Sequence, residues 1–222
     1  MTVLAEDLMA GVFCNRDEYL PKLQDSLTKF FPDMPLIIIR HNGTITDGYI
    51  SMINAFEKSG KRFQLWMDDD IIILNPDIIE HAFQLLISQK YAAVIAHMTY
   101  KTAALTTPYD ASLLVPPLAP RLEKVLMGYF MLVDGWRVKD IKPDVNLPYP
   151  NISVETDYGL SIQASGYEFG ICADYVYHQN KKDNNTKEQY LETNQYLENK
   201  WGQFFKDNVV YDGYLLNLPL TK

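Results

Sequence analysis

The sequence predicts an α/β domain with a central, mostly parallel sheet flanked by helices. Short apolar runs alternate with amphipathic segments along the first 97 residues, which is the pattern of repeated strand–helix units. The apolar runs are continuous, as in Leu36-Ile37-Ile38-Ile39, and such runs are typical of strands buried on both faces of a parallel sheet. A chain of 222 residues with 47% hydrophobic and 22% charged residues is expected to form one globular domain over residues 1–222.

The first half contains four predicted strands with a helix between each pair. Leu20, Leu23, Leu27 and Phe30 show the three- and four-residue spacing of one helical face, and Asp17 is expected to cap that helix. Two further helices have similar apolar faces, and a glycine suits the C-terminus of the first of these. The predicted strands are 11–14, 36–39, 65–67 and 91–96, and the helices begin near Asp17, Tyr49 and Pro76.

The second half is less regular. Residues 97–127 contain four prolines and are expected to form a long loop of the kind that often lines a substrate. Beyond this loop we predict strands at 128–133, 169–172 and 175–178, a helix that starts at about residue 154, and an exposed helix within 180–200.

Bulk properties exclude some classes of function. The net charge is −8 with a pI of about 5.0, which disfavours a broad electrostatic grip on nucleic acid. No stretch approaches the roughly 18 continuous apolar residues of a membrane helix, and no signal peptide is visible. Cys14 and Cys172 lie in apolar segments and are expected in the core. We therefore expect a soluble, cytoplasmic protein.

Three adjacent carboxylates form the most informative feature of the chain. Asp68, Asp69 and Asp70 stand between the apolar runs 63–67 and 71–74. Adjacent carboxylates repel one another, and partial burial disfavours their charged forms further. Oxygen ligands suit a hard divalent ion such as Mn²⁺ or Mg²⁺, which commonly sits against substrate phosphates. The triplet therefore predicts a metal site for a phosphorylated ligand, with an acidic surface turn between two strands as the alternative.

Polar residues also follow the first two predicted strands. Asn15 and Arg16 come after the first strand, and His41 and Asn42 come after the second. Ligands of parallel α/β sheets bind beyond the carboxyl ends of the strands. We expect these residues and the acidic triplet to converge at one edge of the sheet.

Read together, these segments resemble the GT-A-fold glycosyltransferases, in particular the large inverting family 2. Met67-Asp68-Asp69-Asp70 is similar to the DxD motif of that family, and the resemblance spans residues 10–202. One departure is that the family usually places an Asp after the second strand to bind the nucleotide base, whereas this chain has Arg40-His41-Asn42. The similar segments are 12–20 with 26–27, 67–70 with 76–77, 128–133, 155–162 with 166–167, and 176–178.

The resemblance implies a metal-dependent transferase that moves a sugar, with inversion, from a nucleoside-diphosphate sugar to an acceptor hydroxyl. Asp68 and Asp70 would hold Mn²⁺ or Mg²⁺, with His178 as a further ligand or a contact to the diphosphate. Glu155 is favoured as the general base, with Asp157 orienting the acceptor or the base, and either carboxylate can be the base. The structural alternative for this pair is that both carboxylates stabilise the first turn of a helix through its dipole.

The resemblance also implies where the donor binds. Asn15, Arg16 and Asn54 would contact the nucleotide, as would His41 and Asn42, and Asp69 would contact the ribose or the sugar. A UDP-linked donor is expected. Residues 10–97 would form the donor half, 98–178 the acceptor half and 179–222 a helical tail. Tyr129 and Trp136 are candidates for stacking on the acceptor.

Two other functions fit the sequence less well. An apolar strand ending in Asp68-x-Asp70 loosely matches the nucleophile motif of haloacid-dehalogenase-type phosphohydrolases, but the later lysine and paired aspartates are not found in the expected order. A non-catalytic GT-A-like domain that binds a nucleotide sugar or a glycan is the second alternative. The acceptor stays open between a saccharide, a lipid-linked glycan, a protein and modified DNA.

Overall fold

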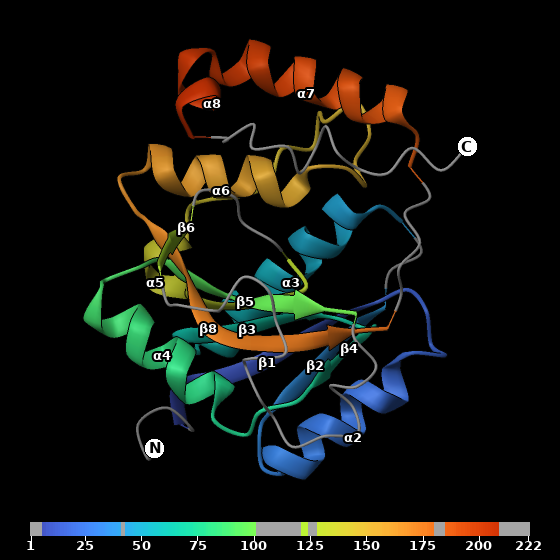
Figure 1. Ribbon diagram of the computed structural model, residues 1–222, viewed down its shortest axis with the longest axis vertical. Helices are drawn as coiled ribbons and strands as arrows, with labels where there is room; N and C mark the ends of the chain where they lie inside the picture. The colour runs from blue at the N-terminus through green and yellow to red at the C-terminus, as the bar shows by residue number, and fades with distance from the viewer. Residues whose placement is uncertain (1–5, 41–42, 101–120, 124–127, 180–184, 209–222) are drawn as a thin grey trace.

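A computed structural model describes residues 6–40, 43–100, 121–123, 128–179 and 185–208. Their strands form one sheet with helices on both faces (Figure 1). The strands are β1 (Leu8–Cys14), β2 (Leu36–Arg40), β3 (Phe63–Asp68), β4 (Ile71–Ile73), β5 (Ala93–Thr99), β6 (Arg121–Glu123), β7 (Phe130–Asp134) and β8 (Phe169–His178). The helices are α2 (Leu20–Phe30), α3 (Ile45–Ser59), α4 (Ile78–Ser88), α5 (Gly135–Val138), α6 (Val154–Ala164), α7 (Lys187–Trp201) and α8 (Gln203–Asn208).

The sheet is more mixed than the sequence predicts. Its described strands follow the order β2-β1-β3-β7-β5-β8-β4, with β6 beside β8. The pairs β1–β2, β1–β3 and β5–β8 are parallel, whereas the pairs that β7, β4 and β6 make are antiparallel. Continuous apolar sequence reports burial on both faces of a strand but not its direction, which is why the α/β class is confirmed while the antiparallel strands were not foreseen.

Local signals place most helix boundaries. Gly60 has a φ of 68° and ends α3 in the left-handed conformation, as expected. Thr44 starts α3 earlier than predicted, through a capping box with Asp47. The prediction that Asp17 caps α2 is wrong, because the N-cap is Tyr19 and no side chain caps this helix.

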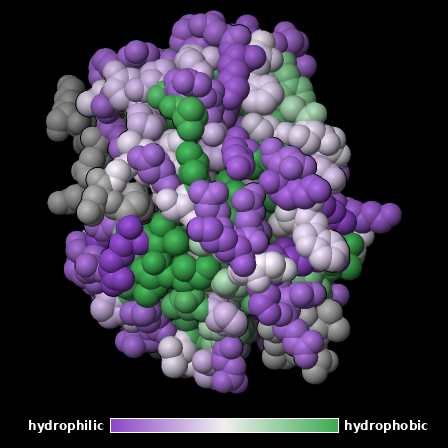
Figure 2. Space-filling view, turned by 180° about the vertical axis from the view of Figure 1, so that it is seen from behind, coloured by the Kyte–Doolittle hydropathy of each residue, from purple (hydrophilic) through white to green (hydrophobic). Residues whose placement is uncertain are grey.

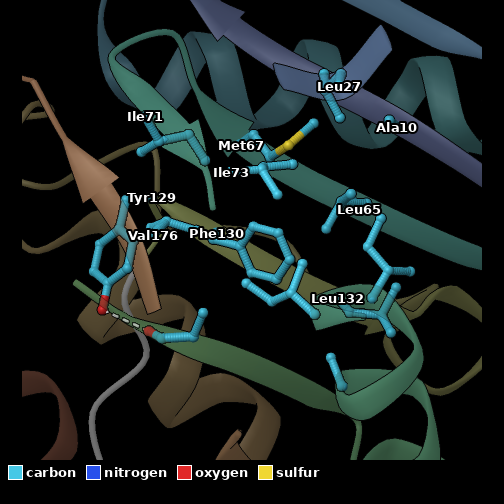
Figure 3. Close-up of a cluster of buried hydrophobic side chains, with 14 of the residues drawn as sticks. Ala10, Leu27, Leu65, Met67, Ile71, Ile73, Tyr129, Phe130, Leu132 and Val176 are labelled. Carbon is cyan, nitrogen blue, oxygen red and sulfur yellow. Dashed lines mark hydrogen bonds between the residues drawn. The ribbon is translucent and has the colours of Figure 1, made fainter. Parts of the chain in front are cut away.

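Two hydrophobic clusters hold the layers together. The first lies between the sheet and helices α2 and α4, and Figure 3 shows it around Leu65, Met67 and Phe130. The second lies between the opposite face of the sheet and helices α3 and α6, with α7 and α8 packed beyond α6 (Figure 1). Both cysteines are free and buried, as predicted.

The rear surface of the protein is mainly hydrophilic, with a hydrophobic patch in its lower part (Figure 2). Within the described parts of the chain, every helix is too short or too polar to cross a membrane.

Candidate active site

A cleft lies where β1 and β3 end. These strands are parallel neighbours in a register that sets Phe13 opposite Asp68, so the segments after them emerge together. The cleft has a volume of about 430 Å³, counting space open to solvent. Its lining residues are Phe13, Asn15, Arg16, Ile45, Tyr49, Asp68, Asp69 and Glu155.

The middle carboxylate of the triplet, Asp69, holds the loop after β1. Its Oδ2 accepts hydrogen bonds from the backbone N–H groups of Asn15 (2.9 Å) and Arg16 (2.8 Å). Its Oδ1 accepts a further bond from Nη2 of Arg16 at 2.9 Å. Asp69 is almost fully buried. These three hydrogen bonds all come from the loop after β1. The carboxylate of Asp69 thereby fixes the place of two residues that the family resemblance proposes for nucleotide binding.

Asp70 and His178 are brought together by the pairing of two strands. In the antiparallel β4–β8 register, Ile71 lies opposite His178, and the N–H of Gln179 donates to the carbonyl of Asp70 at 2.7 Å. Nε2 of His178 then lies 3.4 Å from Oδ1 of Asp70. That Oδ1 is buried and accepts no hydrogen bond from the described residues, while Oδ2 accepts one from Arg16 at 2.6 Å. A buried carboxylate oxygen without a donor fits the ligand position of a metal.

Asp68, Asp70 and His178 form one group of potential metal ligands. Each offers one ligand atom, and these atoms lie within 4.8 Å of one another. Burial, with the nearby charges of Asp70 and Glu155, raises the pKa of Asp68 well above its ordinary value. Burial also raises the pKa of Asp70, although His178 and Arg16 oppose the shift. A bound divalent cation would offset this cost of clustered charge. Two carboxylates with one imidazole form a donor set that can hold such a cation.

Glu155 lies in the wall of the same cleft, in the first turn of α6. Burial raises the pKa of its carboxyl group. Gly128 makes room for this side chain, because a Cβ on Gly128 would lie 3.0 Å from Cγ of Glu155 and 2.2 Å from the hydroxyl oxygen of Tyr49. A carboxylate with a raised pKa in a cleft is well suited to accept a proton.

The comparisons with known proteins give a fold rather than a close relative. No family model and no curated protein matches the sequence. A mannosyltransferase from Pyrobaculum calidifontis, solved with GDP-Man and Mn²⁺, has a similar structure (TM-score 0.56, 11% identity, 91% of this chain and 64% of that one). TarS 1-349 from S. aureus has a TM-score of 0.55 at 11% identity, over 96% of this chain and 76% of that one. The catalytic domain of Drosophila beta1,4galactosyltransferase 7, complexed with xylobiose, has a TM-score of 0.52 at 14% identity, over 81% and 75%.

This chain has the GT-A glycosyltransferase fold. The resemblance that the sequence indicates is thereby confirmed at the level of structure. In this GT-A domain, the cleft lies at the carboxyl ends of β1 and β3, where the sequence predicts the donor site.

The structure separates the two carboxylates that the sequence pairs as candidate base. Asp157 is fully buried, and its carboxylate is not among the groups that line the cleft. It accepts hydrogen bonds from Nζ of Lys200 (2.7 Å), Nε1 of Trp201 (2.9 Å) and the N–H of Asp144 (3.2 Å). Asp157 therefore joins α6 to α7 and to the loop before α6, and the geometry favours Glu155 over Asp157 as the group that meets a substrate.

Removing the Lys200 ammonium is expected to destabilise the fold. Lys200→Met leaves Asp157 and Asp144 without their shared cation, and we expect a loss of about 2–3 kcal/mol at pH 7, below the full cost of breaking a buried pair because Lys200 is partly exposed. Urea denaturation measures this loss. Lys206→Met is the matched control, since Lys206 pairs with Glu198 at an exposed site and its loss is expected to cost at most about 1 kcal/mol. Equal losses in the two variants would contradict the anchoring role of the cluster.

The same cluster gives the wild-type protein an acid-sensitive stability. Hydrogen bonds from Lys200, Asn146 and Tyr196 lower the pKa of Asp144 from 3.8 to about 2, despite burial. A depressed carboxyl pKa contributes stability that is present above the unfolded value and lost as pH falls through the folded value. The free energy of unfolding should therefore fall between about pH 4 and pH 2, and less steeply in Lys200→Met. Denaturation curves at several pH values check this, and identical slopes would contradict it.

The other predicted site residues do not all lie at the cleft. Asn54 is exposed on α3 and is not among the residues that line the cleft. His41 and Asn42 lie outside the described residues. Tyr129 lies near the metal-ligand group, with its ring centroid 6.3 Å from that of His178. Trp136 follows the carboxyl end of β7, which runs antiparallel to β3. Trp136 therefore lies near the start of β3, whereas the acidic triplet lies at the end of β3.

Sequence reasoning missed the apolar and aromatic wall of the cleft. Phe13, Ile45 and Tyr49 line it. Phe13 is part of an apolar strand, and Tyr49 lies on the apolar face of a helix, so in the sequence both are typical of core residues. No local signal distinguishes a core aromatic residue from one whose polar tip reaches a cleft.

Proposed function

We propose that this protein is a metal-dependent inverting glycosyltransferase. It would move a sugar from a nucleoside-diphosphate sugar, with UDP-linked sugars as the first candidates, to an acceptor hydroxyl. The observation that carries the proposal is the placement of Asp68, Asp70 and His178 beside a cleft whose wall also contains Glu155. Support comes from the shared fold of a mannosyltransferase that binds GDP-Man and Mn²⁺.

The departing nucleoside diphosphate gains negative charge as the sugar leaves. Asp68, Asp70 and His178 would hold Mn²⁺ or Mg²⁺, which as a Lewis acid stabilises that charge. Oδ1 of Asp70 is the oxygen best suited to the ion, since Arg16 already occupies Oδ2. Arg16 and Asn15 also line the cleft, where they would bind the nucleotide.

Asp69 would support donor binding indirectly. Its hydrogen bonds hold the backbone of Asn15 and Arg16, so it keeps both residues at the cleft. This differs from the direct contact to ribose or sugar that the resemblance implies, and it follows from the three bonds that the buried carboxylate accepts from the loop.

Glu155 would take the proton of the acceptor hydroxyl. Burial shifts the pKa of this carboxyl group upward, toward neutral pH. A general base is most effective when its pKa lies near the pH at which the enzyme works. One base and a single in-line attack at the anomeric carbon would invert its configuration, in contrast to the double displacement of a retaining enzyme.

A product assay tests the proposal. UDP-, GDP-, CMP- and TDP-sugars are incubated with the protein and Mn²⁺. Release of the nucleotide, as the sugar is transferred to water or to an added glycan, is measured with and without EDTA. We expect release from one donor class only in the presence of metal, and NMR of the transferred sugar should show inverted anomeric configuration. Donor binding without turnover against any acceptor would instead favour the non-catalytic alternative.

Metal affinity is expected to fall on mild acidification. The pKa values of Asp68 and Asp70 are raised in the folded protein, so protons compete with the metal for these ligands at higher pH than for ordinary carboxylates. Mn²⁺ titrations by calorimetry between pH 8 and pH 5 should show a progressive loss of affinity. An affinity that does not change over this range would argue against these two carboxylates as ligands.

A further inference from the structure

The ring of Tyr49 is fixed by aromatic packing. Tyr49 is 1% exposed and stacks on Phe13 with 4.7 Å between ring centroids. It meets Trp66 edge-on at 5.3 Å and Tyr158 edge-on at 6.2 Å. These contacts hold the ring on three sides, so its hydroxyl group has a defined position in the cleft wall.

The hydroxyl of Tyr49 lies beside the carboxylate of Glu155. A Cβ on Gly128 would be 2.2 Å from the hydroxyl oxygen and 3.1 Å from Oε1 of Glu155, so both oxygens border the same small space. The hydroxyl is buried and makes no hydrogen bond of standard geometry among the described residues, and the carboxylate of Glu155 is the acceptor within its reach. A buried hydroxyl that lacked an acceptor would cost stability, and phenylalanine would keep the ring contacts without that cost, so the nearby carboxylate is the group that can satisfy the hydroxyl.

Tyr158 shows what distinguishes Tyr49. Tyr158 is equally buried, stacks on Trp66 at 5.7 Å, and its hydroxyl also has no partner among the described residues. Burial alone raises the pKa of Tyr158. The pKa of Tyr49 is raised by burial and additionally by the charges of Glu155 and Asp68. Only Tyr49 of these two tyrosines lines the cleft, and its hydroxyl stays protonated, and therefore a donor, at neutral pH.

We propose that Tyr49 positions Glu155 for catalysis. Its hydroxyl donates a hydrogen bond to one carboxylate oxygen of Glu155, which leaves the other oxygen free to face the acceptor hydroxyl. A glutamate side chain has several rotatable bonds, and the fixed phenol limits them. This inference rests on the proposed role of Glu155 as the base. It adds a residue that the sequence places only on the apolar face of a helix.

The test compares two variants that each delete one buried hydroxyl. Tyr49→Phe and Tyr158→Phe are assayed for Mn²⁺-dependent nucleotide release from the donor that the wild-type protein uses, with kcat and KM measured separately. We expect Tyr49→Phe to lower kcat by about 10- to 100-fold with little change in donor KM, as for loss of one hydrogen bond to a charged group. Tyr158→Phe should keep the wild-type kcat. Tyr158→Phe should melt at or above the wild-type temperature, because it loses an unsatisfied hydroxyl. Tyr49→Phe keeps the ring contacts and should remain folded at the assay temperature.

The outcomes separate this inference from the proposed function. Wild-type kcat in Tyr49→Phe, or an equal loss in Tyr158→Phe, would overturn the positioning role while the proposed function stands. A wild-type protein that releases nucleotide from no donor would overturn the proposed function and this inference with it. Gly128→Ala is a second probe, since its methyl group would intrude on both the hydroxyl of Tyr49 and Glu155. It should lower kcat as Tyr49→Phe does, and an unchanged kcat would contradict the proposed arrangement.

Discussion

Asp70→Asn is expected to weaken Mn²⁺ binding by at least about 100-fold, because a direct ligand should matter no less than the outer-shell groups whose loss costs 10- to 100-fold. The substitution preserves the shape of the side chain but removes the charge that Oδ1 directs toward His178 and Asp68. Without metal, the variant should not melt below the wild-type protein by more than a few degrees. The reason is that burial already disfavours the charged form of Asp70, and Arg16 keeps Asp69 as a partner. Calorimetric titration with Mn²⁺ measures the affinity.

Asp134→Asn is the control for Asp70→Asn. Asp134 is also fully buried and paired with an arginine, Arg62, at 2.8 Å. It lies opposite Phe63 at the start of β3, whereas Asp70 follows the end of β3. This variant should lose stability and still bind Mn²⁺ with wild-type affinity. Wild-type Mn²⁺ affinity in Asp70→Asn would remove Asp70 from the proposed metal site.

Glu155→Gln is expected to lower the rate of sugar transfer by about 10²- to 10⁴-fold, the usual contribution of a general base. Glutamine fills the same space beside Gly128 but cannot accept the proton. Because Glu155 is not in the group of metal ligands, donor and Mn²⁺ affinities should stay within a few-fold of the wild type. Rates at saturating donor, together with donor affinities from calorimetry, separate the two effects.

Asp157→Asn is the matched control on the same helix. It weakens the contacts to Lys200 and Trp201, so it should lower the melting temperature while retaining far more activity than Glu155→Gln below that temperature. The reverse order of activities would assign the base to Asp157 and would contradict the division of roles between the two carboxylates.

The choice between Glu155 and Asp157 shows where sequence reasoning stops. Residues two apart on an α-helix point about 200° away from each other, so one of them faces the cleft and the other faces away. The sequence contains both carboxylates but does not fix the rotation of α6. That rotation depends on tertiary contacts such as those of Asp157 with Lys200, 43 residues further along the chain.

The fold was easier to predict from sequence than the sheet pairing. Continuous apolar runs located β1, β2, β3, β5 and β7, and the resemblance placed His178 near the acidic triplet. Strand β4 was missed, because Ile71–Ile73 is only three residues long and directly follows the aspartates. Its antiparallel pairing with β8 is nevertheless what brings Asp70 and His178 together. Pairing between distant segments carries no local sequence signal.

The measurement that most directly tests a metal-dependent donor site is a thermal-shift titration of the wild-type protein with UDP-, GDP-, CMP- and TDP-sugars, each with Mn²⁺ and with EDTA. A ligand that binds only the native state raises the melting temperature by mass action. We predict that one class of nucleotide sugar raises the melting temperature with Mn²⁺ and not with EDTA, and that Asp70→Asn abolishes this shift. Equal shifts with Mn²⁺ and EDTA, or no shift with any donor, would contradict a metal-dependent donor site at Asp68, Asp70 and His178.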